Sequence, residues 1–239
     1  MNIILVGCEF AGKTTLANEI VEWSKVTFGG YSHFHDHFTI PSSELTDEAK
    51  EEYRLSSPQI KEMFQRFMIQ YHISTEFFSN LDHNLMGIHI EEAVYAPLYY
   101  GYGGKNSGAP LRSPVGQRSE MARLVEAQIL TRAPNLVLVL VKASAEVIQV
   151  RMKNYENTRV GDRDSEPFGV PTRGIVKPSD VDHVIERFEE EFDASILPNK
   201  IVLDTSSATI SETLNQFIKE VDLFLSENDR RRRAEYLKS

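Results

Sequence analysis

Cysteine, long hydrophobic runs and net positive charge are all scarce in this sequence, and each shortage excludes a class of protein. The single cysteine, Cys8, cannot form an intrachain disulfide, so a secreted disulfide scaffold is excluded. The longest apolar run covers residues 136–141, far below the roughly 20 residues of a membrane-spanning helix. Residues 1–7 hold a short apolar run without basic residues before it, which is typical of a strand rather than a signal peptide. We therefore expect a cytoplasmic protein without a membrane partner.

The balance of charge is acidic. Lys and Arg number 26 against 35 Asp and Glu, which gives a formal net charge of −9. Because binding to nucleic acid without sequence preference needs a basic surface, we expect no nucleic-acid partner. The chain has 239 residues, 41% of them hydrophobic, and contains neither an internal repeat nor a linker. This size and composition predict a single domain over residues 1–239.

Strand-like and helix-like segments alternate along the chain. Short apolar or β-branched runs predict strands, and longer segments with apolar residues at the helical period predict helices. The expected strands cover residues 3–6, 31–38, 85–90, 136–141 and 200–203. The expected helices cover residues 13–26, 42–54, 58–80, 119–132, 145–155, 179–196 and 211–225. This alternation predicts an α/β fold of three layers, in which a five-stranded parallel sheet has helices on both faces.

A phosphate-binding loop is the strongest signal in the sequence. Residues 7–14, Gly-Cys-Glu-Phe-Ala-Gly-Lys-Thr, match the pattern G-x-x-x-x-G-K-[ST] between an expected strand and an expected helix. In such a loop the backbone N–H groups and the positive end of the helix hold phosphate oxygens. Lys13 then reaches the β- and γ-phosphates of ATP, and the Thr14 hydroxyl is a ligand of Mg²⁺. The predicted ATP-binding residues are Gly7, Glu9, Phe10, Ala11, Gly12, Lys13, Thr14 and Thr15.

Two adjacent carboxylates, Glu91 and Glu92, follow the expected strand 85–90. Open α/β sheets place ligand-facing residues at the carboxyl ends of their strands, where the phosphate loop also lies. Because successive residues of a strand face opposite ways, we expect one of the two to face the loop. A carboxylate in that place is able to hold Mg²⁺ or to accept a proton from an attacking hydroxyl. The alternative is that both are solvated charges at the end of a strand.

Several segments carry a resemblance to known kinases. Residues 91–99, Glu-Glu-Ala-Val-Tyr-Ala-Pro-Leu-Tyr, resemble the Glu-Arg-Ser-x-Tyr-Ser-Asp-Arg-Tyr segment of the deoxynucleoside kinases and the Asp-Arg-Tyr stretch of thymidylate kinases. Residues 64–67, Phe-Gln-Arg-Phe, resemble the Phe-Gln-x-Tyr helix of the nucleoside kinases. The phosphate loop, the acid after the third strand, an arginine-bearing segment and Asp204 follow in the same order as in that family. The resemblance implies the nucleotide-kinase type of P-loop fold and leans toward a homodimer.

The same resemblance implies transfer of the γ-phosphoryl group from ATP·Mg²⁺ to a nucleoside or a nucleoside monophosphate. Glu91 is then the candidate base and, with Thr14, a candidate magnesium ligand, while Arg151 and Arg159 stabilise the transferred group. An acceptor-side insertion is expected at about 36–80, a glycine-rich mobile loop at about 101–118 and a lid at about 151–178. The candidate acceptor-side residues are Asp36, Gln65, Glu92 and Tyr99.

Two departures from the family pattern concern the acceptor. Glu92 stands where the family has an arginine, which removes a positive charge beside the phosphates. Pro97 and Leu98 stand where the family has an Asp-Arg pair that contacts the sugar. If Glu91 matches the family's base, these departures predict that the catalytic acid is kept while substrate recognition differs.

Other clusters leave alternatives open. His33, His35 and His37 share one face of the expected strand 31–38, which suits either a metal ion or packed aromatic rings. The arginines after residue 150 belong either to a lid or to an exposed loop, and the run at 230–233 is interpreted as a solvated helix end or tail. Two other functions also remain open, namely an ATPase or switch without a small acceptor, and a regulatory ATP-binding protein without catalysis.

Overall fold

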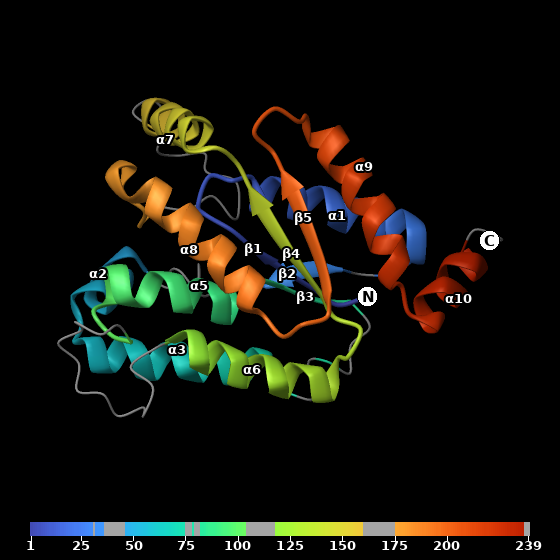
Figure 1. Cartoon of the computed structure of the whole chain (residues 1–239), viewed down its shortest axis with the longest axis horizontal. Coiled ribbons are helices and arrows are strands. Elements are labelled where there is room, and N and C mark those ends of the chain that lie inside the picture. Colours follow the sequence, from blue (N-terminus) through green and yellow to red (C-terminus); the bar gives the residue numbers. More distant parts are fainter. Residues whose placement is uncertain are drawn as a thin grey trace.

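Parallel strands form the centre of the fold in the order β2-β3-β1-β4-β5 (Figure 1). The computed structural model describes residues 1–30, 32–35, 46–74, 78, 82–103, 118–159 and 175–236. Within these residues the strands are β1 (Ile3–Val6), β2 (His33–His35), β3 (His83–Met86), β4 (Val137–Lys142) and β5 (Asn199–Asp204). Because every neighbouring pair is parallel, the carboxyl ends of all the strands lie at one edge of the sheet.

Helices cover both faces of this sheet (Figure 1). On one face lie α1 (Lys13–Phe28), α9 (Ile210–Val221) and α10 (Glu227–Tyr236). On the other face lie α5 (Ile88–Tyr95), α8 (Val181–Ala194) and, packed against α5, α3 (Pro58–His72) and α6 (Arg118–Arg132). The remaining elements are α2 (Asp47–Leu55), α7 (Ala145–Arg159), the π-helix η1 (Ala96–Tyr100) and the 3-10 turns η2 (Pro178–Asp180) and η3 (Asp222–Phe224). The predicted three-layer α/β fold is confirmed.

Burial explains why the central strands were recognisable in the sequence. All of β1 is buried, and β4 is buried from Val137 to Val141. Both strands have neighbours on either side and helices on both faces, so their sequences are continuously apolar. The edge strand β5 alternates instead, with Ile201 and Leu203 buried and Val202 exposed. None of the described helices is long and apolar enough to cross a membrane.

Several helix boundaries agree with expectation and others differ. α1 begins at Lys13, and Ser57 caps α3 by accepting a hydrogen bond from the Ile60 N–H at 3.4 Å. α3 ends at His72, however, well before residue 80. The helix expected at 179–196 begins at Val181, after η2. Residues 36–45 of the expected insertion, 104–117 of the expected loop and 160–174 of the expected lid lie outside the described residues.

The expected strand 85–90 is wrong in its second half. β3 ends at Met86, and α5 begins at Ile88 after a glycine with φ of 76°. A buried strand and a buried helix both have continuously apolar sequences, so periodicity alone did not separate them. The break lies at Gly87, where φ is positive, and at Ile88, where φ is 48°. Glu91 and Glu92 consequently belong to a helix and not to the end of a strand.

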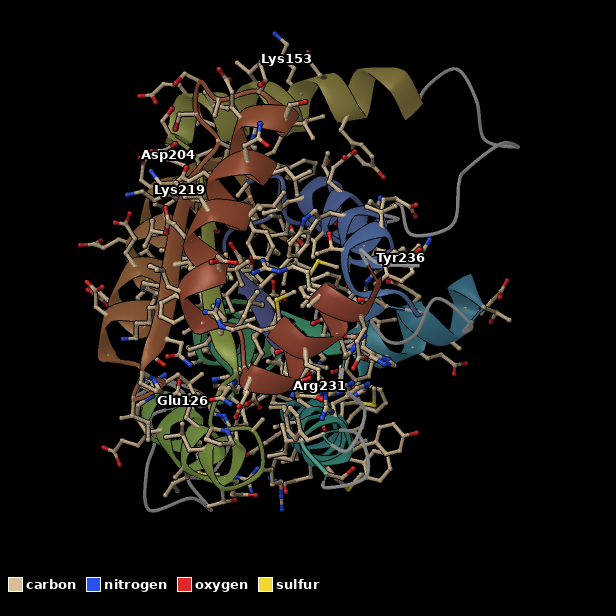
Figure 2. All side chains as sticks on the ribbon, turned by 90° about the vertical axis from the view of Figure 1, so that its right-hand side faces the viewer. Glu126, Lys153, Asp204, Lys219, Arg231 and Tyr236 are labelled. Carbon is tan, nitrogen blue, oxygen red and sulfur yellow. The ribbon has the colours of Figure 1, made fainter. Side chains whose placement is uncertain are left out.

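The carboxyl-terminal part also differs from the prediction. The amphipathic helix expected at 211–225 ends at Val221, and the arginine run at 230–233 belongs to a further helix, α10. Tyr236 of α10 packs on Gly29, where an added Cβ would lie 2.8 Å from the ring, and Figure 2 shows this helix beside α1. The run is not simply a solvated tail, because Arg232 is only 16% exposed.

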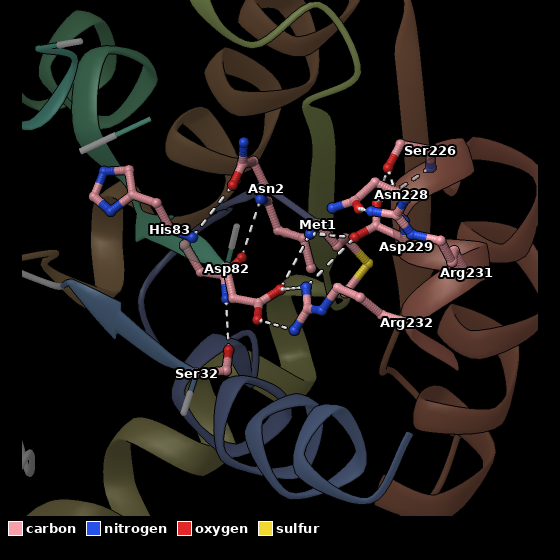
Figure 3. A network of polar contacts seen from close by, with 12 residues as sticks. Met1, Asn2, Ser32, Asp82, His83, Ser226, Asn228, Asp229, Arg231 and Arg232 are labelled. Atoms are coloured by element: carbon pink, nitrogen blue, oxygen red, sulfur yellow. Dashed lines mark hydrogen bonds and ion pairs between the residues drawn. The ribbon is translucent and has the colours of Figure 1, made fainter. Parts of the chain in front are cut away.

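Arg232 takes part in a network at the amino ends of the strands (Figure 3). It pairs with Asp82 at 2.7 Å, and the Met1 ammonium group donates to Asp82 at 3.1 Å and to Asp229 at 2.8 Å. Asp229 also accepts a hydrogen bond from the Ser226 hydroxyl at 2.6 Å. We call Met1, Asp82, Asp229 and Arg232 the amino-edge cluster. The cluster connects the start of the chain before β1, the residue before β3 and the helix α10, which are far apart in the sequence.

Candidate active site

The phosphate loop connects β1 to α1 at the carboxyl edge of the sheet. Gly7 has φ of 144°, and a Cβ there would lie 2.0 Å from the Val141 carbonyl oxygen of the neighbouring strand. Gly12, with φ of 103°, is the residue before α1. The glycines therefore allow the backbone to pass close to β4 and to turn into the helix, as a phosphate-binding nest requires. Thr14 and Thr15 are exposed in the first turn of α1.

Lys13 lies over this loop and contacts a carboxylate. Its Nζ donates to the carbonyl oxygens of Gly7 at 2.6 Å and Cys8 at 3.2 Å. The same atom lies 3.2 Å from Oε1 of Glu91, whose side chain is 4% exposed. Two residues 78 positions apart (91 − 13) thus bring opposite charges together at the loop. Of the two carboxylates singled out in the sequence, Glu91 is the one that faces the loop.

Gly87 sets the position of Glu91. A Cβ at residue 87 would lie 2.2 Å from the Glu91 carboxylate carbon, so the carboxyl group packs directly on the glycine backbone. The Gly87 N–H donates to the carbonyl of Leu5 in β1 at 2.7 Å, which ties this turn to the strand before the phosphate loop. The short turn from β3 into α5 therefore delivers Glu91 to Lys13.

Glu9 and Cys8 face inward from the loop. The Glu9 carboxylate accepts hydrogen bonds from the backbone N–H groups of Ile175 at 3.2 Å and Val176 at 3.0 Å. Burial raises the pKa of Glu9, although these two N–H groups act in the opposite direction. Burial also raises the pKa of the Cys8 thiol to about 12, so the sulfur stays protonated and unreactive at neutral pH.

Arg151 braces the loop from α7. Its Nη1 donates to the carbonyl of Phe10 at 3.1 Å and to Oγ1 of Thr205 at 3.0 Å, and its Nη2 donates to the Thr205 carbonyl at 2.8 Å. Desolvation lowers the pKa of Arg151. The guanidinium group thus joins the phosphate loop to the residue after β5. Arg159 is the last residue of α7, and its side chain lies outside the described part of the chain.

Glu92 points to a different neighbour. Successive helical residues are about 100° apart around the axis, so Glu92 leaves α5 away from Glu91. Both of its oxygens accept from Nη2 of Arg118 at 2.6 Å, and one accepts from the Tyr102 hydroxyl at 2.9 Å. Glu92 is buried, which excludes its interpretation as a solvated charge. Arg118 was missed in the sequence because its partner lies 26 residues away and no local pattern marks the pair.

The other acceptor-side candidates are placed as follows. Gln65 is fully buried, and its Nε2 donates to the Tyr53 hydroxyl at 3.1 Å. Burial raises the pKa of Tyr53 to about 12, with a further contribution from the Glu92 carboxylate. Tyr99 donates to Asp180 at 3.0 Å and so joins η1 to η2. Asp36 lies outside the described residues.

The histidine pattern is only partly described. The ring of His35 lies 5.4 Å from that of His72 and 5.1 Å from that of His83. The side chains of His33 and His37 lie outside the described part. Among the residues that were described, no group of three or more metal-ligating side chains gathers in one place.

Two known structures are similar to this protein over most of its length. A deoxyadenosine kinase from M. mycoides with bound dATP superposes with a TM-score of 0.55 and 13% identity, over 93% of this chain and 100% of that one. The fold is that of P-loop nucleoside and nucleotide kinases. A thymidylate kinase from Candida albicans gives a TM-score of 0.54 and 14% identity, over 93% of this chain and 91% of that one. No protein-family model and no curated protein sequence matches the chain.

Proposed function

We propose that this protein transfers the γ-phosphoryl group of ATP to a nucleoside or a nucleoside monophosphate. The observation that carries the proposal is the contact between Lys13 and Glu91, 3.2 Å apart above a glycine-bearing loop. A cation there neutralises charge on the transferred group, and a carboxylate beside it is able to take the proton of an attacking hydroxyl. The kinase fold, with the loop and the acid at the same edge of the sheet, supports this assignment.

The donor side would be formed by the loop and the start of α1. Backbone N–H groups between Gly7 and Thr15 hold the phosphates, and Lys13 turns from the loop carbonyls toward them. Thr14 is exposed and follows Lys13 in the chain, and a hydroxyl and a carboxylate are oxygen ligands of the kind that Mg²⁺ takes. Bound there, the ion would offset negative charge on the phosphates. Thr14 and Glu91 would hold it.

The two arginines of α7 would act in different ways. Arg151 already donates to the Phe10 and Thr205 carbonyls, so it would fix the shape of the loop that holds the donor. Arg159, at the end of the same helix, is proposed to stabilise negative charge on the transferred group. On the acceptor side, Gln65 and Glu92 are proposed to border the acceptor from α3 and α5, with Asp36 and Tyr99 as further candidates. ATP and nucleotides are cytoplasmic compounds, and we propose a cytoplasmic location.

The test is acceptor-dependent release of ADP. Purified protein with ATP and Mg²⁺ is incubated with a panel of nucleosides and nucleoside monophosphates, with Lys13→Ala as the blank. The proposal expects one acceptor class to stimulate ADP release well above the rate without acceptor. Equal release with and without acceptors would instead support an ATPase or switch. Tight ATP binding without turnover would support a regulatory nucleotide-binding protein.

We also propose that the protein forms a homodimer through α3. Its outward stripe is apolar, with Ile60 49%, Met63 66%, Phe67 65% and Tyr71 51% exposed, opposite the buried Gln65 and Ile69. Such a stripe exposes on the order of 500 Å² of side chain, at the upper end of what monomers leave uncovered. It carries no charged residue in a chain of net charge −9, so a second copy can approach it. Light scattering on a size-exclusion column tests this. Phe67→Lys should give a monomer with unchanged thermal stability, and a monomeric wild type would refute the proposal.

A further inference from the structure

The side chain of Arg118 points into the protein from the first residue of α6, and 3% of it is exposed. Its Nη2 donates to both oxygens of Glu92 at 2.6 Å. Its guanidinium carbon lies 5.6 Å from the ring centroid of Tyr102, whose hydroxyl bonds to the same carboxylate. The guanidinium group is thus held in one orientation by α5 and by the residue two positions after η1.

Only one nitrogen of this guanidinium group is fully used. The Nε and Nη1 atoms of Arg118 are buried and have no hydrogen-bond partner. An oxygen of Glu62 lies 3.6 Å from Nη1, which is an ion-pair distance and too long for a hydrogen bond. Buried N–H groups without an acceptor are uncommon because each loses its bonds to water without replacement. Arg118 therefore offers donors that the described protein does not use.

The residue before the undescribed segment 104–117 makes room for this side chain. Gly103 has φ of 76°, and an added Cβ would lie 2.1 Å from Cγ of Arg118. Any other residue at position 103 would displace the arginine. A close approach of this kind indicates that the path of the Arg118 side chain is specified by the fold.

Charge decides what kind of group these donors suit. Glu92 neutralises Arg118, and Glu62 is paired with Arg66 at 2.6 Å. The formal charges of these four side chains sum to zero, and carboxylates lie on two sides of the Arg118 guanidinium group. A phosphate would meet those carboxylates, whereas an uncharged carbonyl oxygen or ring nitrogen would accept from Nε and Nη1 without repulsion.

The location fits the acceptor side of the site. Glu92 is adjacent to Glu91 in α5, and Tyr53 with its partner Gln65 lies close to Glu92. We propose that Arg118 is a specificity residue whose Nε and Nη1 donate to an uncharged oxygen or nitrogen of the phosphoryl acceptor, of the kind that a nucleobase edge carries. Glu92 is the positioning residue that orients it. This inference rests on the proposed function and names a determinant of its acceptor choice.

The main test replaces both members of the pair. Glu92→Gln with Arg118→Gln removes both charges together, so no buried charge is left unpaired. We expect the KM for the best acceptor to rise at least about tenfold and the preference among bases to fall by a similar factor, because the lost donors read the base. The KM for ATP should stay within about twofold, since the loop is untouched. A double variant with the base preference and acceptor KM of the wild type would overturn the inference.

Two further variants separate specificity from structure. Glu92→Arg with Arg118→Glu keeps the ion pair but moves the cation to α5, and it should fold yet lose base preference. Arg123→Gln is the matched control, because Arg123 lies on the same helix and pairs with buried Glu126 of α6 and buried Glu191 of α8. It should lose stability while base preference is unchanged. A loss of preference in the control as large as in the double variant would contradict the inference.

Binding distinguishes this inference from the proposed function. Calorimetric titration without ATP uses adenosine, guanosine, cytidine, thymidine and their monophosphates as probes. Base-selective binding that disappears in the double variant would uphold the role of Arg118 even if no ADP were released. Absence of binding by every probe to the wild type would overturn it. Selectivity for the monophosphates without selectivity for the base would overturn it as well, because the donors would then serve a phosphate.

Discussion

Charged side chains gather at both ends of the parallel sheet, and the two clusters are built differently. In the amino-edge cluster, Asp82 contacts the Met1 ammonium group and Arg232, and Asp229 contacts the same ammonium group, at 2.7–3.1 Å. At the carboxyl edge, Lys13 pairs with Glu91 at 3.2 Å beside an exposed Thr14. The first cluster uses its charges to join three distant segments. The second keeps its charges next to a loop of backbone donors that suits an anion. The same kinds of residue therefore join distant segments at one edge and, in the proposed function, bind phosphate at the other.

Removal of the loop cation should have the largest effect, and most of that effect should be on function. Lys13→Ala is expected to lower the rate of ADP release by about 10²–10³-fold, because charge on the transferred group is no longer neutralised. Thermal stability should fall as well, because the buried Glu91 carboxylate loses its cation. Lys25→Ala, on the exposed face of the same helix, is the control and should keep full activity. Activity of Lys13→Ala near that of wild type would refute the assignment of the site.

Breaking the amino-edge cluster should give the opposite result. Asp82→Ala removes one of the two carboxylates that contact Arg232 and the Met1 ammonium group, and we expect a loss of about 2–3 kcal/mol in the free energy of unfolding. Urea denaturation measures this loss. The KM for ATP should be unchanged because the cluster lies at the far end of the strands. Glu22→Ala, which breaks only an exposed pair with Lys25, should cost less than about 0.5 kcal/mol.

Gly87→Ala tests how strictly the carboxyl edge is built. The added Cβ would lie 2.2 Å from the Glu91 carboxylate and would need φ of 76°. We expect about 1–2 kcal/mol of destabilisation from backbone strain and, in addition, a drop in kcat from the displaced carboxylate. Gly30→Ala, also at positive φ but with only an arginine nitrogen at 3.9 Å, is the matched control for strain. Equal kcat in the two variants would show that Gly87 does not position Glu91.

The smallest expected effect is a pH dependence of stability from Asp229. Burial alone would raise its pKa, but hydrogen bonds and charge from the Met1 ammonium group and Ser226 hold the pKa below its ordinary value of 3.8. A carboxyl group with a lowered pKa stabilises the fold above the unfolded-state pKa and loses this contribution as the pH falls through the folded-state value. The urea concentration at the unfolding midpoint should therefore decrease as the pH is lowered below about 4. This decrease should be less steep in Asp229→Asn. An identical slope in both proteins would contradict this coupling.

Local patterns made the fold and the phosphate loop predictable. The loop from Gly7 to Thr14 and the buried strand before it are contiguous in sequence, so their residues specify them directly. That one of Glu91 and Glu92 faces the loop was also predicted, because carboxyl ends of parallel strands meet at one edge, and the family resemblance favoured Glu91. The prediction that Glu91 follows a strand was wrong, because the apolar run 85–90 changes from strand to helix at Gly87.

Contacts between distant residues were not predictable. The pairing of Glu92 with Arg118 and of Met1 with Asp229 depends on helices that are brought together only by the complete fold. The sequence of α10 was interpreted as a polar tail because Asp229 is the only one of its residues that is buried. A sequence pattern reports the average character of a segment, and a single buried side chain does not change that average.

Phe10 and Glu9 also connect the phosphate loop to segments that are distant in the sequence. The ring of Phe10 lies 5.6 Å from that of Tyr155 in α7, and Glu9 binds the backbone of Ile175 and Val176. Tyr155 and Ile175 therefore both contact the phosphate loop, at neighbouring residues of that loop. The conformational entropy of bringing Tyr155 and Ile175 to this loop is lost on folding, so phosphate binding there need not offset it.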